Sequence, residues 1–166
     1  MGIYNPGATL GANTFTGTQV YPGVTDASNA AAGVVGEFLS TTVAIGSAVA
    51  LTTTTAANVM SLSLTAGDWD VWGQLQLTGG GSTVLNGFFG NINLTSGTIA
   101  DNTSGGYIGL AWGAVSPFGL IGPISVMVPP RRFNVSSTTS VFMNAEAIFS
   151  VSTCSAYGGL FARRRR

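Results

Sequence analysis

The stretch WDVWGQLQL, residues 69–77, decides the fold because its apolar and polar side chains alternate along an extended chain. The side chains that share the first face are Trp69, Val71, Leu75 and Leu77. Those that share the opposite face are Asp70, Trp72, Gln74 and Gln76. A period of two is that of a β-strand with one face in a core. The stretch therefore predicts a strand whose Trp69 face is buried.

Similar short segments, rich in β-branched and aromatic residues, recur from residue 37 onward. The further strands that we expect are 38–43, 49–53, 59–65, 83–94, 107–112, 124–128, 140–149 and 151–161. Turn signals separate them at 66–68, 79–81 and 128–130. Many short strands without a long helical segment predict an all-β chain, a β-sandwich of the jelly-roll type.

The first 36 residues differ from the rest of the chain. Their apolar residues are isolated among Gly, Ala, Asn, Thr and Pro, and no period is sustained. We expect two parts, an extended N-terminal arm over 1–36 and a β-sandwich domain over 37–166. A short helical turn at 26–35, capped by Asp26 or Ser28, is compatible with the arm.

The composition removes most catalytic chemistry. The chain has no histidine and no lysine, and all six of its basic residues are arginines. Histidine is the usual acid–base group near neutral pH, and serine nucleophiles need a histidine or lysine beside them. Zinc sites need His or Cys ligands, and Cys154 is the only cysteine. We expect Cys154 to be a buried small apolar side chain, and we expect no enzyme activity, cofactor or metal.

Asp68 and Asp70 are the one close pair of carboxylates, and at i and i+2 on a strand they share a face. Such a pair could serve a glycosidase or a calcium site. The favoured interpretation is structural, with Asp68 bonding the backbone of a turn and Asp70 pairing with an arginine or with water.

The charge content points to assembly. Charged residues make up 7% of the chain and the formal net charge is zero, whereas globular proteins carry about 25% charged residues. Soluble monomers usually keep a charged surface, so we expect much of this surface to be covered by copies of the chain or by a larger assembly. A monomer solvated by hydroxyl and amide groups is the alternative. Zero net charge gives no case for nucleic-acid binding.

Two segments bear on membranes and on partners. The uncharged stretch 105–128 is interrupted by Pro117 and Pro123, so we interpret it as strands and turns and expect no membrane partner. The run Arg163–Arg166 is a local positive patch that could meet phosphate or a carboxylate-rich neighbour. Its alternative is a solvated tail.

Three segments resemble the small structural proteins of tailed bacteriophages: DASNAAAGVVGEFL at 26–39, LSLTAGDWDV at 62–71 and SAYGGLFARR at 155–164. The resemblance implies a virion protein with a β-sandwich fold, a homotrimer without catalysis. Fibre proteins of such phages often have long repetitive shafts, and this chain has neither a shaft nor heptad repeats. The resemblance therefore favours a capsid decoration (cement) protein on the capsid surface, with the major capsid protein as its partner.

Trp72 lies on the otherwise polar face of its strand, which favours a subunit interface over burial within one sandwich. We expect the interface residues to be Tyr4, Phe15, Tyr21, Trp72, Arg131, Arg132, Arg163, Arg164, Arg165 and Arg166.

Two other functions stay open at this stage. The first is the tip of a tail fibre that recognises host polysaccharide through Asn102, Tyr107 and Trp112. The second is a depolymerase that uses Asp68 with Asp70.

Overall fold

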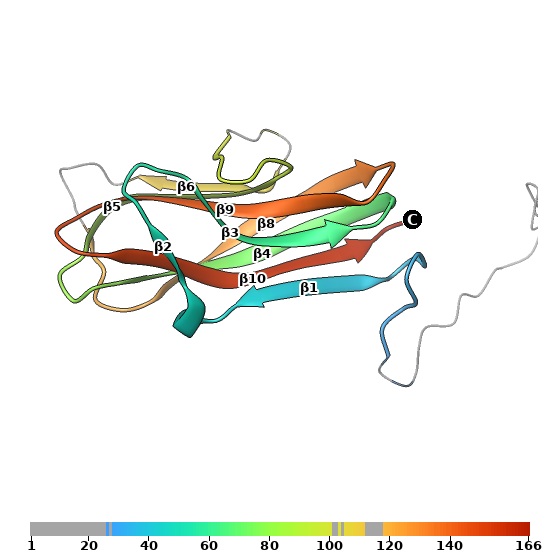
Figure 1. Ribbon diagram of the computed structural model, residues 1–166, viewed down its shortest axis with the longest axis horizontal. Coiled ribbons are helices and arrows are strands. Elements are labelled where there is room, and N and C mark those ends of the chain that lie inside the picture. The colour runs from blue at the N-terminus through green and yellow to red at the C-terminus, as the bar shows by residue number, and fades with distance from the viewer. Residues whose placement is uncertain (1–25, 27, 101–102, 104, 112–117) are drawn as a thin grey trace, which may run out of the picture.

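The computed structural model describes residues 26, 28–100, 103, 105–111 and 118–166, and within them the chain is all-β (Figure 1). Two antiparallel sheets pack face to face as a β-sandwich, and no α-helix occurs among the described residues. One short 3₁₀ turn, η1 (Ile45–Ser47), follows the first strand. The predicted β-sandwich is therefore confirmed, whereas the jelly-roll topology stays a prediction.

The first sheet, here called sheet A, has the order β1-β10-β4-β8, and β2 also pairs with β10. Its strands are β1 (Phe38–Val43), β2 (Val49–Leu51), β4 (Gly67–Gly79), β8 (Ile124–Val135) and β10 (Cys154–Arg164). Sheet B has the order β3-β9-β5-β6, and β7 also pairs with β5. Its strands are β3 (Ala57–Leu64), β5 (Val84–Asn93), β6 (Tyr107–Ala111), β7 (Phe118–Gly119) and β9 (Thr139–Ser150).

The core lies between the two sheets, and β4 supplies its centre. As the sequence predicts, the Trp69 face of β4 is buried. On the opposite face, the side chains from Asp70 to Gln76 are half-buried. The indole Nε1 of Trp69 donates to the backbone oxygen of Thr65 at 2.9 Å, so its polar atom is satisfied inside the core. Cys154 is buried, as expected, and burial raises the pKa of its thiol to about 11.

The chain departs from the prediction at Pro129 and Pro130, where a turn was expected. β8 instead continues through both prolines to Val135. Its register with β4 shifts between Val71 and Gly73, so the two prolines lie at a bulge opposite Trp72. β8 pairs only with β4 in sheet A and is thus an edge strand, where a missing N–H breaks no ladder.

A second departure concerns the C-terminal arginines. β10 runs three residues beyond the predicted end and includes Arg163 and Arg164, and Arg164 is buried. The interpretation of 163–166 as a solvated tail is therefore wrong for Arg164, whereas the side chains of Arg163, Arg165 and Arg166 are exposed. In Figure 1 the end of β10 lies beside the start of β1, and the two strands pair in antiparallel fashion from Phe38↔Arg163 to Val43↔Gly158.

The residues before β1 are fixed to the sandwich by their side chains. The amide of Asn29 donates to the oxygen of Phe38 at 2.6 Å and accepts from its N–H at 3.1 Å, which imitates strand pairing. Residues 32–36 form turns rather than the helical turn considered above. Strand structure begins at Phe38, close to the predicted boundary at 36/37, and residues 1–25 and 27 lie outside the described residues.

We predict that Gly158→Ala lowers the free energy of unfolding by at least about 2 kcal/mol. Gly158 lies in β10 with φ of +142°, and an added Cβ would collide with the backbone oxygen of Gln74 in the neighbouring strand. Urea denaturation followed by tryptophan fluorescence measures the change. Gly46→Ala is the control, because nothing lies within 4 Å of its added Cβ, and its effect should be within about 0.5 kcal/mol. Equal stabilities of the two variants would contradict the prediction.

Candidate functional site

The outer face of sheet A carries three aromatic rings from three strands. Phe38 of β1, Trp72 of β4 and Phe161 of β10 alternate with core residues and therefore point away from the core. Their ring centroids form a triangle with sides of 6.0, 6.1 and 6.2 Å, within the range for favourable aromatic pairs. All three side chains are half-buried. We call Phe38, Trp72 and Phe161 the aromatic patch.

The patch is bordered on two sides by side chains of different character. Towards β8, Met127 is 58% exposed and lies opposite Gln74. Towards the end where β10 finishes, the row across the sheet that begins at Phe38 continues with Arg163, Asp70 and Arg132. The outer face therefore passes from an apolar centre to a charged end.

Asp68 organises the charged end. Arg132 donates to both carboxylate oxygens of Asp68, from Nε at 2.7 Å and from Nη2 at 2.8 Å, and Arg166 Nε donates to Oδ2 at 2.9 Å. The side chain of Asp68 is 6% exposed beneath these two guanidinium groups. Beside them, Arg165 Nη1 lies 3.4 Å from Asp70 Oδ1. We call Arg132, Arg165 and Arg166 the arginine cluster.

The hydrogen bonds and charges of the arginines hold the pKa of Asp68 below its usual value, with those of Arg132 the largest cause. Asp68 is thus a carboxylate that stays ionised, whereas a general acid needs a raised pKa. The interpretation that Asp70 pairs with an arginine is confirmed. The carboxylate of Asp68 bonds guanidinium groups instead of the turn backbone that we expected.

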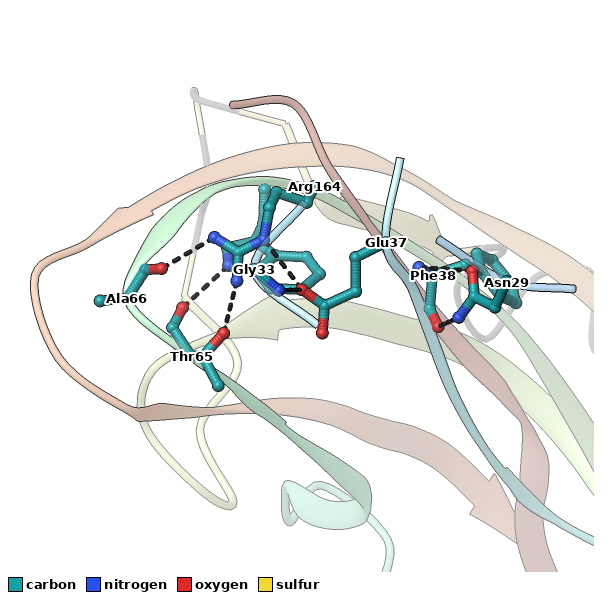
Figure 2. A network of polar contacts seen from close by, with 8 residues as sticks. Asn29, Gly33, Glu37, Phe38, Thr65, Ala66 and Arg164 are labelled. Atoms are coloured by element: carbon teal, nitrogen blue, oxygen red, sulfur yellow. Dashed lines mark hydrogen bonds and ion pairs between the residues drawn. The ribbon is translucent and has the colours of Figure 1, made fainter. Parts of the chain in front are cut away.

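Behind the charged end, Arg164 points inward and forms a buried ion pair with Glu37 (Figure 2). Arg164 Nε donates to Glu37 Oε2 at 2.9 Å, and the two side chains are 4% and 5% exposed. Nη1 donates to the oxygen of Ala66 at 2.8 Å and Nη2 donates to the hydroxyl of Thr65. The guanidinium also lies over the ring of Trp69, 4.3 Å from its centroid.

Glu37 has a second partner on the N-terminal side of β1. The N–H of Gly33 donates to Glu37 Oε2 at 2.7 Å (Figure 2). Burial by itself would raise the pKa of Glu37, but this hydrogen bond, together with the hydrogen bond and charge of Arg164, outweighs burial and lowers it. The pair is therefore ionised inside the protein, with Glu37 Oε2 accepting hydrogen bonds from both Gly33 and Arg164.

The residues predicted for an interface fall into three groups. Trp72, Arg132, Arg163, Arg165 and Arg166 lie together on the outer face of sheet A. Arg164 is buried, and Arg131 donates from Nη1 to the oxygen of Ile92 at 3.0 Å and lies over the ring of Phe133. The third group lies outside the described residues and comprises Tyr4, Phe15 and Tyr21, together with Asn102 and Trp112 of the polysaccharide alternative.

Sequence reasoning missed Phe38 and Phe161 as partners of Trp72. Each alternates with core residues in its own strand, but their proximity depends on the register of β1 and β10 with β4. It also missed the pairing of Glu37 with Arg164, 127 residues apart in sequence. The sequence signal that could have indicated this pair is Glu37, a lone glutamate at the start of a predicted strand in a chain with few charges.

No metal or membrane feature adds to this site. Within the described ranges, no group of three or more His, Cys, Asp or Glu side chains is arranged to hold a metal ion. The same part of the chain contains no helix with the length and apolar character needed to cross a membrane.

No protein-family model, no curated protein and no solved structure matches this chain.

We predict that Arg164→Met lowers the free energy of unfolding by about 3–5 kcal/mol, because it leaves the Glu37 carboxylate buried without its counter-charge. The double variant Glu37→Gln/Arg164→Met should lose less than the sum of the two single variants, since the pair is coupled. Urea denaturation of all three proteins gives the coupling energy. Arg165→Met is the control, because its side chain is 50% exposed and its loss should cost at most about 1 kcal/mol. Equal losses for Arg164→Met and Arg165→Met would refute the assigned role of the pair.

Proposed function

We propose that this chain is a non-enzymatic structural protein that acts through the outer face of sheet A. The observation that supports this most directly is the aromatic patch, three half-buried rings on a sheet face bordered by the arginine cluster. Tryptophan and arginine are enriched among the residues that contribute most to protein–protein binding. A sheet face that presents both, in a chain with 7% charged residues, fits a surface that is covered in an assembly.

The assembly that we propose is a bacteriophage head. The chain would be a homotrimeric capsid decoration (cement) protein that binds the major capsid protein on the capsid surface. The phage setting and the trimer are carried over from the resemblance of segments 26–39, 62–71 and 155–164. A protein that binds only the assembled lattice stabilises it by mass action. Weak contacts made by many copies together stabilise the lattice strongly.

In this arrangement the aromatic patch makes the contact between copies and the N-terminal segment contacts the lattice. Asn29 and Gly33 bond to Phe38 and Glu37, so residues from 29 onward help to hold the sandwich. We therefore assign the lattice contact to residues 1–25. This segment contains no charged residue and includes Tyr4, Phe15 and Tyr21.

We predict that Trp72→Ser weakens association of the copies by at least about 30-fold, as expected for a residue worth about 2 kcal/mol at an interface. Analytical ultracentrifugation over a range of concentrations measures the association constant. Gln76→Ser is the matched control, because it lies on the same face of β4 and outside the patch. Circular dichroism confirms that both variants are folded. Identical association of the Trp72 and Gln76 variants would exclude the patch as the contact between copies.

The capsid role has its own test, in which residues 26–166 are compared with the full chain for binding to phage heads. We expect the shorter protein to remain folded and associated but to lose head binding. Immunogold electron microscopy with an antibody against the chain locates it on intact particles. Dense label over the head supports decoration, whereas label confined to the tail supports the fibre-tip alternative and its polysaccharide ligand. Undiminished head binding by 26–166 would remove the N-terminal segment from the proposal.

A further inference from the structure

The arginine cluster surrounds a hollow at the charged end of sheet A. The hollow has a volume of about 290 Å³ and is lined by Asp68, Arg132, Arg165 and Arg166. The exposed fractions of the three arginine side chains are 48%, 50% and 73%. Solvent and small solutes therefore reach the guanidinium groups from outside.

Around the hollow, the arginine side chains have more N–H donors than the described residues have oxygen acceptors for them. A guanidinium has five N–H donors. Arg132 uses Nε and Nη2 on Asp68, Arg166 uses Nε on Asp68, and Arg165 reaches Asp70 only at 3.4 Å. The remaining N–H groups of three neighbouring guanidiniums lie around the same space. Both oxygens of Asp68 already accept hydrogen bonds from arginines.

The charge balance favours an anion. The side chains that line the hollow belong to three arginines and one aspartate and together carry a charge of +2, and the Asp70 side chain beside Arg165 reduces this sum to +1. The chain as a whole has a formal net charge of zero, so this is a local excess of positive charge. Planar guanidinium groups bind carboxylate, sulfate and phosphate with paired, charge-assisted hydrogen bonds.

We propose that this hollow is an oxyanion-binding site. Arg165 and Arg166 supply most of the N–H donors to the ligand, and the Arg132–Asp68 pair forms the base of the site. The ligand is one carboxylate, sulfate or phosphate group. This group belongs either to a free ion or to an acidic side chain of a neighbouring protein chain. Binding of an acidic side chain rests on the proposed function, whereas binding of a free ion is independent of it.

The test is isothermal titration calorimetry of the full chain with sodium sulfate and with sodium acetate, at constant ionic strength set with sodium chloride. We expect saturable binding of sulfate and of acetate at one site per chain. The double variant Arg165→Gln/Arg166→Gln should bind sulfate at least about tenfold more weakly, since it loses charge-assisted hydrogen bonds. It should fold normally, because Asp68 keeps both bonds from Arg132 and both replaced side chains are exposed.

Arg163→Gln is the matched control, because Arg163 belongs to the same arginine run and does not line the hollow. It should bind sulfate as the unaltered chain does. Absence of saturable binding, or equal loss of affinity in the Arg163 variant and the double variant, would overturn the proposal. The source is separated by repeating the ultracentrifugation in sulfate. Competition between sulfate and association identifies an acidic side chain of a second copy as the source, and association unaffected by sulfate excludes a second copy. Head binding that sulfate weakens identifies an acidic side chain of the capsid, and head binding unaffected by sulfate leaves the free ion as the source.

Discussion

A buried guanidinium group holds together the two ends of the described chain. Arg164 is inside the sandwich, where its charge is balanced by Glu37 and its N–H groups reach Thr65 and Ala66. Burying an ion pair is costly unless further hydrogen bonds support it, and here Gly33, Thr65 and Ala66 supply them. The contact joins the residues before β1, the turn between β3 and β4, and the end of β10 above the ring of Trp69. One side chain therefore ties three segments together at the end of sheet A where β1 begins and β10 finishes.

The orientation of Arg164 decides what the outer surface carries. Side chains of a strand alternate, so an inward Arg164 requires Arg163 and Arg165 to point outward. The same alternation along β10 places Phe161 beside Trp72 and the arginines at the neighbouring end of the face. The four consecutive arginines are thus divided between a structural role for Arg164 and surface roles for the others. A single extra residue before them would exchange those roles.

The sequence predicted the fold well where a local pattern determines it. The alternation at 69–77, the strand at 38–43 and the Gly-rich turn at 79–81 are confirmed. The prediction failed at Pro129 and Pro130, because prolines usually end a strand and only the edge position of β8 allows them. Asn93 begins an Asn-x-Thr triplet that we interpret as chance in a chain rich in Asn, Ser and Thr, and its buried side chain bonds Thr95 and Thr98.

The site could be predicted only in part, since its components come together through register between distant strands. The polar context of Trp72 in β4 was enough to select it, but Phe38 and Phe161 are core-like aromatics in their own segments. The clustered arginines were visible in the sequence. Which of them is buried and which lies at the surface depends on their pairing with Glu37 and Asp68. A chain with so few charges neutralises Glu37 and Arg164 inside and leaves a positive excess at one end of one face. That separation of charge places polar side chains beside apolar ones, the arrangement that would give the proposed interface both affinity and orientation.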